Sequence, residues 1–181
     1  MNKTDKERNN RKWLIILLII GIVVCLLVAG WALFFREGPA PLTPDYPPQG
    51  TEENQTPIDG DNGDKLDSPE GGGAISVTYG TAVTVDLSDE TVTLYYANPQ
   101  ASNQNVAILI MLDGDEELVV AKSELINPGN QVTQLALDEY AKTRLQAGGY
   151  NATLVIRAYD PESGEKAMVD TKGEITLTVQ D

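Results

Sequence analysis

Carboxylates are the only abundant acid–base groups in this sequence, so any catalytic chemistry would have to use them. The 181 residues include no histidine, the commonest general base and metal ligand near neutral pH. Two pairs, Asp113 with Asp115 and Asp160 with Glu162, have the residue types of a two-carboxylate hydrolase. Both pairs fall in turns, where acidic residues are common because they form local hydrogen bonds. We therefore expect no enzymatic activity and no catalytic residue.

A run of four aspartates in a proline- and glycine-rich part of the chain invites comparison with a calcium loop. The run consists of Asp59, Asp61, Asp64 and Asp67. A helix-loop-helix calcium site needs Asp-x-Asx-x-Asx-Gly with a glutamate at the twelfth position, and Gly63 takes the third ligand position here. We favour a solvated linker without metal or other cofactor. A calcium-stabilised adhesion module that uses the acidic loops remains an alternative.

The cysteine content and the charge exclude further classes of function. The only cysteine, Cys25, lies inside an apolar run, so the rest of the chain can form neither a disulfide nor a Cys/His zinc site. From Arg36 onward there are eight basic and 25 acidic residues, a formal net charge of −17. Such a surface repels phosphate backbones, so we expect no nucleic-acid partner.

An uncharged run at residues 13–35 predicts one transmembrane helix. It has 23 residues, and about 20 apolar residues cross a bilayer as a helix. The run is longer than a signal-peptide core, so we expect an uncleaved signal anchor. Five basic residues precede it within residues 1–12, and the positive-inside rule keeps that tail in the cytoplasm. The rest of the chain is then extracellular on a single-pass protein of the plasma membrane.

Residues 36–73 read as a linker that holds a domain away from the membrane. They contain seven prolines and seven glycines. The first part is proline-rich and predicted to be extended, whereas the second part is acidic and predicted to be flexible.

Residues 74–181 show the two-residue periodicity of strands. Alternating segments are expected at residues 75–87, 91–99, 105–112, 117–123, 131–137, 150–160 and 167–180. Turn signals such as Asn127–Asn130 separate them, one helical turn is expected within residues 138–149, and a kink is expected at Gly173. Seven or eight short strands in about 108 residues predict an all-β fold, an antiparallel Greek-key β-sandwich.

The residues Leu145, Gly148 and Tyr150 form the pattern Leu-x-x-Gly-x-Tyr just before the most regular strand. This resembles the tyrosine corner of Greek-key sandwiches, in which the phenol bonds to the backbone a few residues upstream. The resemblance is to immunoglobulin-like and fibronectin-type-III-like modules. The whole layout resembles small single-pass surface proteins of Gram-positive bacteria (Firmicutes), although the usual Leu-Pro-x-Thr-Gly wall-anchoring signal is absent.

A membrane-anchored extracellular binding or structural module is the function that these features favour. An accessory subunit of a cell-envelope assembly, such as a secretion or conjugation apparatus, is the alternative. A polar loop at residues 97–106 could contact an unknown extracellular protein or glycan, because loops carry function on such scaffolds. Its candidate contact residues are Asn98, Asn103, Gln104 and Asn105.

Overall fold

The structure is a computed structural model that describes residues 13, 17–18, 20–22, 48, 50–68, 73–114 and 118–181. The chain divides into two compact units, Met1–Thr43 and Pro44–Asp181. In the first unit the described residues are helical. Among the described residues, no helix is both long and apolar enough to span a membrane. Residues 1–12 and most of the run 13–35 lie outside the described residues, so the anchor stays a prediction.

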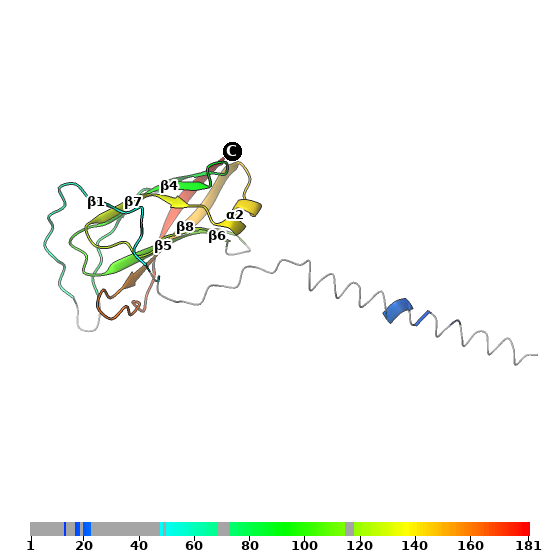
Figure 1. The fold of residues 1–181 in the computed structure, drawn as a ribbon, viewed down its shortest axis with the longest axis horizontal. Helices are drawn as coiled ribbons and strands as arrows, with labels where there is room; N and C mark the ends of the chain where they lie inside the picture. Colours follow the sequence, from blue (N-terminus) through cyan, green and yellow to red (C-terminus); the bar gives the residue numbers. More distant parts are fainter. Residues whose placement is uncertain are drawn as a thin grey trace, which may run out of the picture. The chain divides into compact units, whose positions relative to one another are not determined.

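The second unit is an all-β domain with one short helix (Figure 1). Its described strands are β1 (Thr56–Pro57), β2 (Thr78–Tyr79), β3 (Ala82–Asp86), β4 (Thr91–Asn98), β5 (Asn105–Leu112), β6 (Leu118–Lys122), β7 (Asn130–Ala136), β8 (Gly148–Tyr159) and β9 (Thr171–Gln180). Helix α2 (Glu139–Arg144) lies between β7 and β8. The predicted all-β class is therefore confirmed.

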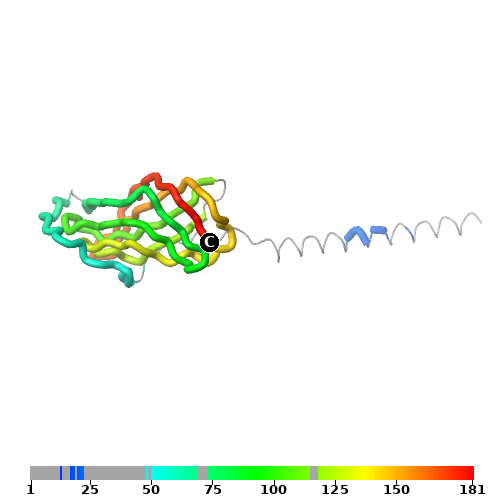
Figure 2. The backbone as a smooth tube through the Cα atoms, turned by 90° about the horizontal axis from the view of Figure 1, so that it is seen from above, coloured from blue at the N-terminus to red at the C-terminus, as the bar shows by residue number. Residues whose placement is uncertain are grey.

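The strands form one curled sheet in the order β1-β7-β4-β3-β9-β8-β5-β6, and β2 pairs with β4. Among the pairs of strands given above, only β3 with β9 is parallel, in register from Ala82–Thr176 to Asp86–Gln180, and an isolated parallel bridge joins Thr51 to Leu125. The sheet is therefore mixed, and the prediction of a purely antiparallel Greek-key sandwich is not supported. Figure 2 shows the curled sheet from above, with its strands running along the length of the domain.

One hydrophobic core fills the space inside the curl, with side chains from both halves of the sheet. Strand β9 illustrates its origin, because Ile175, Leu177 and Val179 are buried while every intervening residue is exposed. This alternation follows from the two-residue period of a strand. The opposite half contributes buried residues such as Val92 and Leu94 of β4 to the same cluster.

Local features explain where several elements begin and bend. Asp138 caps α2, because its carboxylate accepts the N–H of Tyr140 at 2.9 Å and of Ala141 at 3.4 Å. Gly129 has a φ of 83°, the left-handed conformation required at the third position of a type II turn. β9 and its pairing with β8 continue without a break through Gly173, where a kink was predicted. A Cβ at this position would collide with the Tyr79 phenol, and close packing therefore explains the glycine.

Residues 50–68, which we call the strap, differ most from the expected structure. They were predicted to be part of a flexible linker, but they lie against the domain through β1 and a series of polar contacts. Thr56 and Pro57 pair with Gln131 and Asn130 at the start of β7. The folded unit thus includes part of the segment 36–73, and the predicted domain boundary at residue 74 lies too late in the chain.

Candidate functional site

The carboxylates of the predicted catalytic pairs serve local structure. Asp160 Oδ1 accepts the N–H of Glu162 at 3.0 Å and the N–H and hydroxyl of Ser163 at 2.8 Å and 3.0 Å. The backbone N–H of Ser163, followed by that of Glu162, holds the pKa of Asp160 below its ordinary value of 3.8. A carboxylate with a lowered pKa is a weaker general base near neutral pH, and the contacts of Asp160 are those of a residue that stabilises a turn.

The second pair cannot be assembled from the described residues. Asp113 accepts a hydrogen bond from the Thr153 hydroxyl at 2.8 Å, which ties the end of β5 to β8. Asp115 lies outside the described residues. The position of Asp113 is explained by a contact between neighbouring strands.

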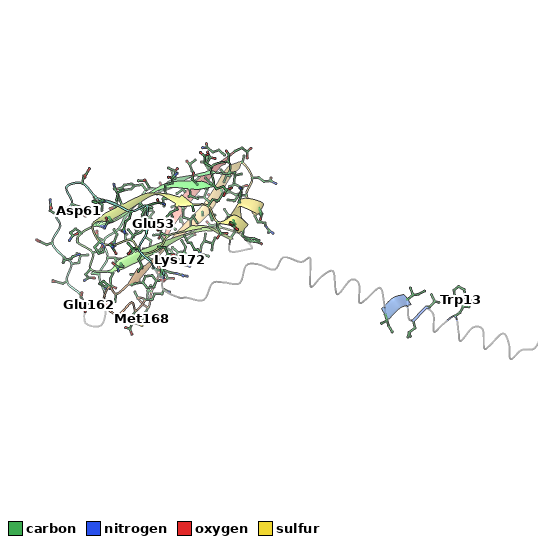
Figure 3. The ribbon with its side chains drawn as sticks, in the orientation of Figure 1. Trp13, Glu53, Asp61, Glu162, Met168 and Lys172 are labelled. Carbon is green, nitrogen blue, oxygen red and sulfur yellow. The ribbon has the colours of Figure 1, made fainter. Side chains whose placement is uncertain are left out.

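The aspartate run of the strap is distributed along the surface. Asp61 is labelled in Figure 3. Its Oδ2 accepts the N–H of Gln100 at 2.6 Å, and its Oδ1 accepts the N–H of Gly63 at 3.5 Å. In the part of the chain that the structure describes, no group of three or more histidine, cysteine, aspartate or glutamate residues is placed to hold a metal ion. The contacts of Asp61 attach the strap to the domain.

The three residues of the predicted tyrosine corner lie together at the start of β8. The Tyr150 hydroxyl donates to the carbonyl of Gln146 at 2.9 Å, one residue after Leu145. Leu145 is buried and caps the C-terminus of α2, while its N–H donates to the carbonyl of Ala141. The Tyr150 ring is half-buried and packs against the hydrophobic core. These contacts connect α2 to the sheet.

The predicted interaction loop is largely internal. Asn98 is fully buried, and its side-chain amide donates to the carbonyls of Gln104 at 3.1 Å and Ile126 at 3.0 Å. Gln104 is also buried, and Asn105 is half-buried at the first position of β5 opposite Tyr159. The expectation that these side chains form a free binding loop is therefore wrong for Asn98 and Gln104. The burial of Asn98 could have been predicted from the sequence, because Asn98 continues the two-residue spacing of the inward-facing residues of β4.

Asn103 has the most informative position in this loop. Its side-chain oxygen accepts the N–H of Ala74 at 2.8 Å, and its nitrogen donates to the Leu66 carbonyl at 3.2 Å and the Ser68 hydroxyl at 2.5 Å. One amide thus holds the end of the strap and the beginning of the segment that leads to β2. The side chain of Asn103, which was predicted to contact a partner, therefore binds the protein's own chain.

Glu52 anchors the other end of the strap, and sequence reasoning did not identify it. Its carboxylate is buried and accepts the N–H of Glu124 at 2.9 Å and of Asn54 at 3.2 Å. Its own N–H donates to the carbonyl of Leu125 at 2.8 Å. The neighbouring Glu53 is exposed (Figure 3). A buried carboxylate that accepts backbone N–H groups holds its segment at one place. This role could not be predicted from the sequence, because it does not follow a periodic pattern.

The strap covers two stretches of the domain, residues 100–103 and 124–131, which we call the seat. Besides Glu52 and Asp61, further strap residues bind the seat. The N–H of Ile58 donates to Gly129 at 2.9 Å, the Gln55 side chain accepts from Asn127 at 3.0 Å, and Lys65 donates to the Ser102 carbonyl at 2.7 Å. The strap therefore occupies the seat through hydrogen bonds along both of its stretches.

In the described part of the folded unit, few large apolar side chains outside the strap are exposed. Met168 is 99% exposed and Val169 is 78% exposed, and both lie in the connection between β8 and β9, as does Glu162 (Figure 3). The same connection is fixed by an ion pair of Asp170 with Lys166 at 3.0 Å. Two adjacent apolar residues form too small an area to define a binding site on their own.

Comparisons with known proteins identify no family. No protein-family model matches the chain, and no curated protein matches it significantly. The solved structures that are similar to it include the periplasmic chaperone SfaE, with 14% identity over 58% of this chain and 56% of that one and a TM-score of 0.37. The major fimbrial subunit AggA of Escherichia coli is 12% identical, covering 64% of this chain and 100% of that one, with a TM-score of 0.27.

The pilin subunit CooA of enterotoxigenic Escherichia coli is also similar, at 13% identity over 59% of this chain and 99% of that one, with a TM-score of 0.29. The match to SfaE spans little more than half of that chaperone. Since these TM-scores are all below 0.5, the similarities carry no argument about function.

Proposed function

We propose that this protein is a membrane-anchored extracellular module that acts by binding or by structure and not by catalysis. The observation that carries the proposal is the use of its candidate chemical groups in internal contacts. Asp160 stabilises a turn, Asp61 holds the strap, and Asn98 supports the interior of the sheet. Because these polar groups bond to the protein's own chain, they support a structural or binding role better than a catalytic one.

The membrane part of the proposal rests on the sequence. The uncharged run 13–35 has the length of a transmembrane helix, and the basic residues before it favour a cytoplasmic N-terminus. The compact domain then lies outside the plasma membrane, in keeping with the resemblance to single-pass surface proteins of Gram-positive bacteria. An uncleaved anchor followed by a proline-rich segment would display the domain near the cell surface.

Protease treatment of intact cells tests the orientation. A C-terminal epitope should disappear when protease is added outside, whereas a tag before residue 13 should survive until the cells are broken. Survival of the C-terminal epitope on intact cells, with digestion after lysis, would show the opposite orientation and refute the proposed display.

A second measurement separates a metal-free module from the calcium-stabilised alternative. Thermal unfolding of the full chain in detergent should have the same midpoint with calcium and with a chelator. A midpoint that falls in chelator and recovers with calcium would favour the alternative, because a ligand that binds only the folded state stabilises it.

A further inference from the structure

The strap contributes no side chain to the hydrophobic core of the domain, and the bonds described above that join it to the domain are hydrogen bonds. None of its residues, all of which the structure describes, belongs to the hydrophobic core or to the half-buried residues that pack against it. Its backbone bonds are short, such as 2.8 Å from Leu66 N–H to the Ala101 carbonyl and 2.9 Å from Ile58 N–H to the Gly129 carbonyl. A segment outside the hydrophobic core opens at a lower free energy than the strands that form the core, so the strap is expected to leave the seat while the domain stays folded.

An empty seat would contain several backbone groups without their partners. The N–H and carbonyl of Leu125, the N–H of Asn127 and the carbonyls of Ala101 and Gly129 all bond to the strap. Some of these groups lie beside β7, where β1 continues the sheet. Because unpaired strand edges recruit other extended segments, an open seat favours a replacement strap.

We propose that the strap is exchanged between copies of this protein, so that residues 50–68 of one molecule occupy the seat of a second molecule. A second copy is the occupant that fits the seat, because its strap has the same residues as the original strap. It therefore supplies the same acceptors for the N–H groups of Glu124 and Gln100, and its β1 can pair with β7 in the same register. Exchange therefore needs no new interface. It is a form of domain swapping, which links copies at low cost.

The sequence after the strap allows a crossing between molecules. Residues 69–73 join the strap to the segment before β2 and include three consecutive glycines, Gly71 to Gly73. Five residues of any sequence span up to roughly 17 Å when extended, which limits the distance between the two domains of an exchanged pair. Within one molecule, the side chain of Asn103 bonds both Ser68 and Ala74, so the two ends of this connection lie close together.

Exchange becomes effective when copies are concentrated. The strap of a second molecule competes for the seat with the strap of the same molecule. The latter has a high effective concentration, because it is tethered to its own domain. The inference rests on the proposed function in this respect, because confinement to a membrane brings neighbouring copies into the range where exchange competes. Reciprocal exchange would give dimers, and one-way exchange would give open chains.

Disulfide trapping tests the exchange directly. Cys25 is the only native cysteine, so it is first replaced by serine in the full chain. Thr56 and Gln131 are register partners of β1 and β7. Directly opposite residues of antiparallel strands generally have the Cα separation that a disulfide needs. A Thr56→Cys chain and a Gln131→Cys chain, carrying tags of different size, are mixed at high concentration in detergent and then oxidised.

The expected product is a mixed dimer joined through positions 56 and 131. A matched control mixes Thr56→Cys with Thr178→Cys, an exposed position on β9 that is not part of the seat. The 56–131 dimer should exceed the control dimer by about tenfold, because only paired strands hold two Cα atoms in disulfide geometry. Adding Glu52→Ala to the Thr56→Cys chain should reduce the dimer, whereas Glu53→Ala should leave it unchanged.

A chain that carries both cysteines completes the design. It should close an internal disulfide when dilute, which fixes the strap on its own domain and prevents mixed dimers. Equal yields for the 56–131 and control pairs would overturn the exchange, and so would failure of the double variant to close, because the seat would then not be the described one. Since the samples are in detergent, a negative result is independent of the orientation measured by protease on cells.

Discussion

The carboxylate of Glu52 accepts the backbone N–H of Glu124 at 2.9 Å, although 72 residues separate them in the sequence. This bond places the first residues of the strap beside the end of the β5–β6 half of the sheet. It also brings the Glu124 side chain near the strap, where its carboxylate accepts the N–H of Gly50 at 3.1 Å. The two glutamates thus bind each other's segments through backbone groups.

Replacing Glu52 by alanine should loosen the strap. The change removes the acceptor of two N–H groups, and a hydrogen bond to a charged group contributes about 1.5–3 kcal/mol. We expect faster hydrogen exchange at the amides of Glu124 and Leu125 and a smaller loss in global stability, because the core is untouched. Glu53→Ala is the matched control, since Glu53 is adjacent and exposed. Unchanged exchange at Glu124 in the Glu52→Ala variant would contradict the anchoring role.

Tyr150 should contribute to stability through its hydroxyl and its ring separately. Tyr150→Phe removes the exposed bond to Gln146, so we expect a loss of about 0.5–1.5 kcal/mol. Tyr150→Ala also removes a half-buried ring, and its cost should be larger but below the roughly 3–5 kcal/mol of a fully buried aromatic residue.

Urea unfolding of both Tyr150 variants measures these losses. Tyr95→Phe serves as the control, because Tyr95 is 41% exposed on β4. Equal stability of Tyr150→Ala and the unchanged protein would mean that the corner does not support the fold.

Much of the sheet could be predicted because its strands alternate. β8 and β9 have inward residues at every second position over most of their length, and burial of one face imposes this pattern. The parallel pairing of β3 with β9 could not be predicted, because alternation identifies a strand and its buried face but not its neighbour. The sequence between Ala82 and Asp86 is compatible with either direction.

The strap could not be predicted for a different reason. Its composition is polar and rich in proline and glycine, which is also the composition of an unstructured linker. What orders it is a set of partners far along the chain, such as Leu125 for Glu52 and Gln100 for Asp61. Asn103 shows the same limit, since its residue type fits a binding loop and a structural clamp equally well.

Acid should weaken the turns that Asp86 and Asp160 stabilise. The N–H of Asp89 and the hydroxyl of Ser88 lower the pKa of Asp86 from 3.8, and the N–H of Ser163 does the same for Asp160. A lowered folded-state pKa means that the stabilisation is fully present above the unfolded value. It is lost as the pH falls through the lower folded value.

Carboxyl-carbon NMR titration should therefore give both aspartates midpoints below 3.8. Ser163→Ala removes one donor and should raise the pKa of Asp160 while leaving that of Asp86 unchanged. If Asp160 titrates identically with and without the Ser163 hydroxyl, the hydrogen bond is not a cause of the shift.

Tyr96 should tolerate the loss of its hydroxyl. The side chain is fully buried, and burial raises the pKa of its phenol. The hydroxyl has no hydrogen-bond partner among the described residues, so in the folded state it loses the bonds that it makes to water when unfolded. Tyr96→Phe keeps the ring and removes this unpaired group, so we expect equal or higher stability, by up to about 1–3 kcal/mol.

The urea midpoint of Tyr96→Phe measures this effect, and Tyr96→Leu provides the contrast. Leucine keeps an apolar side chain but fills less of the site, so it should be destabilising through the cavity that it leaves. A loss of stability in Tyr96→Phe comparable to that in Tyr96→Leu would show that the hydroxyl is satisfied, with a buried water as the remaining partner. A gain for phenylalanine and a loss for leucine together would show that Tyr96 supports the core through its ring alone.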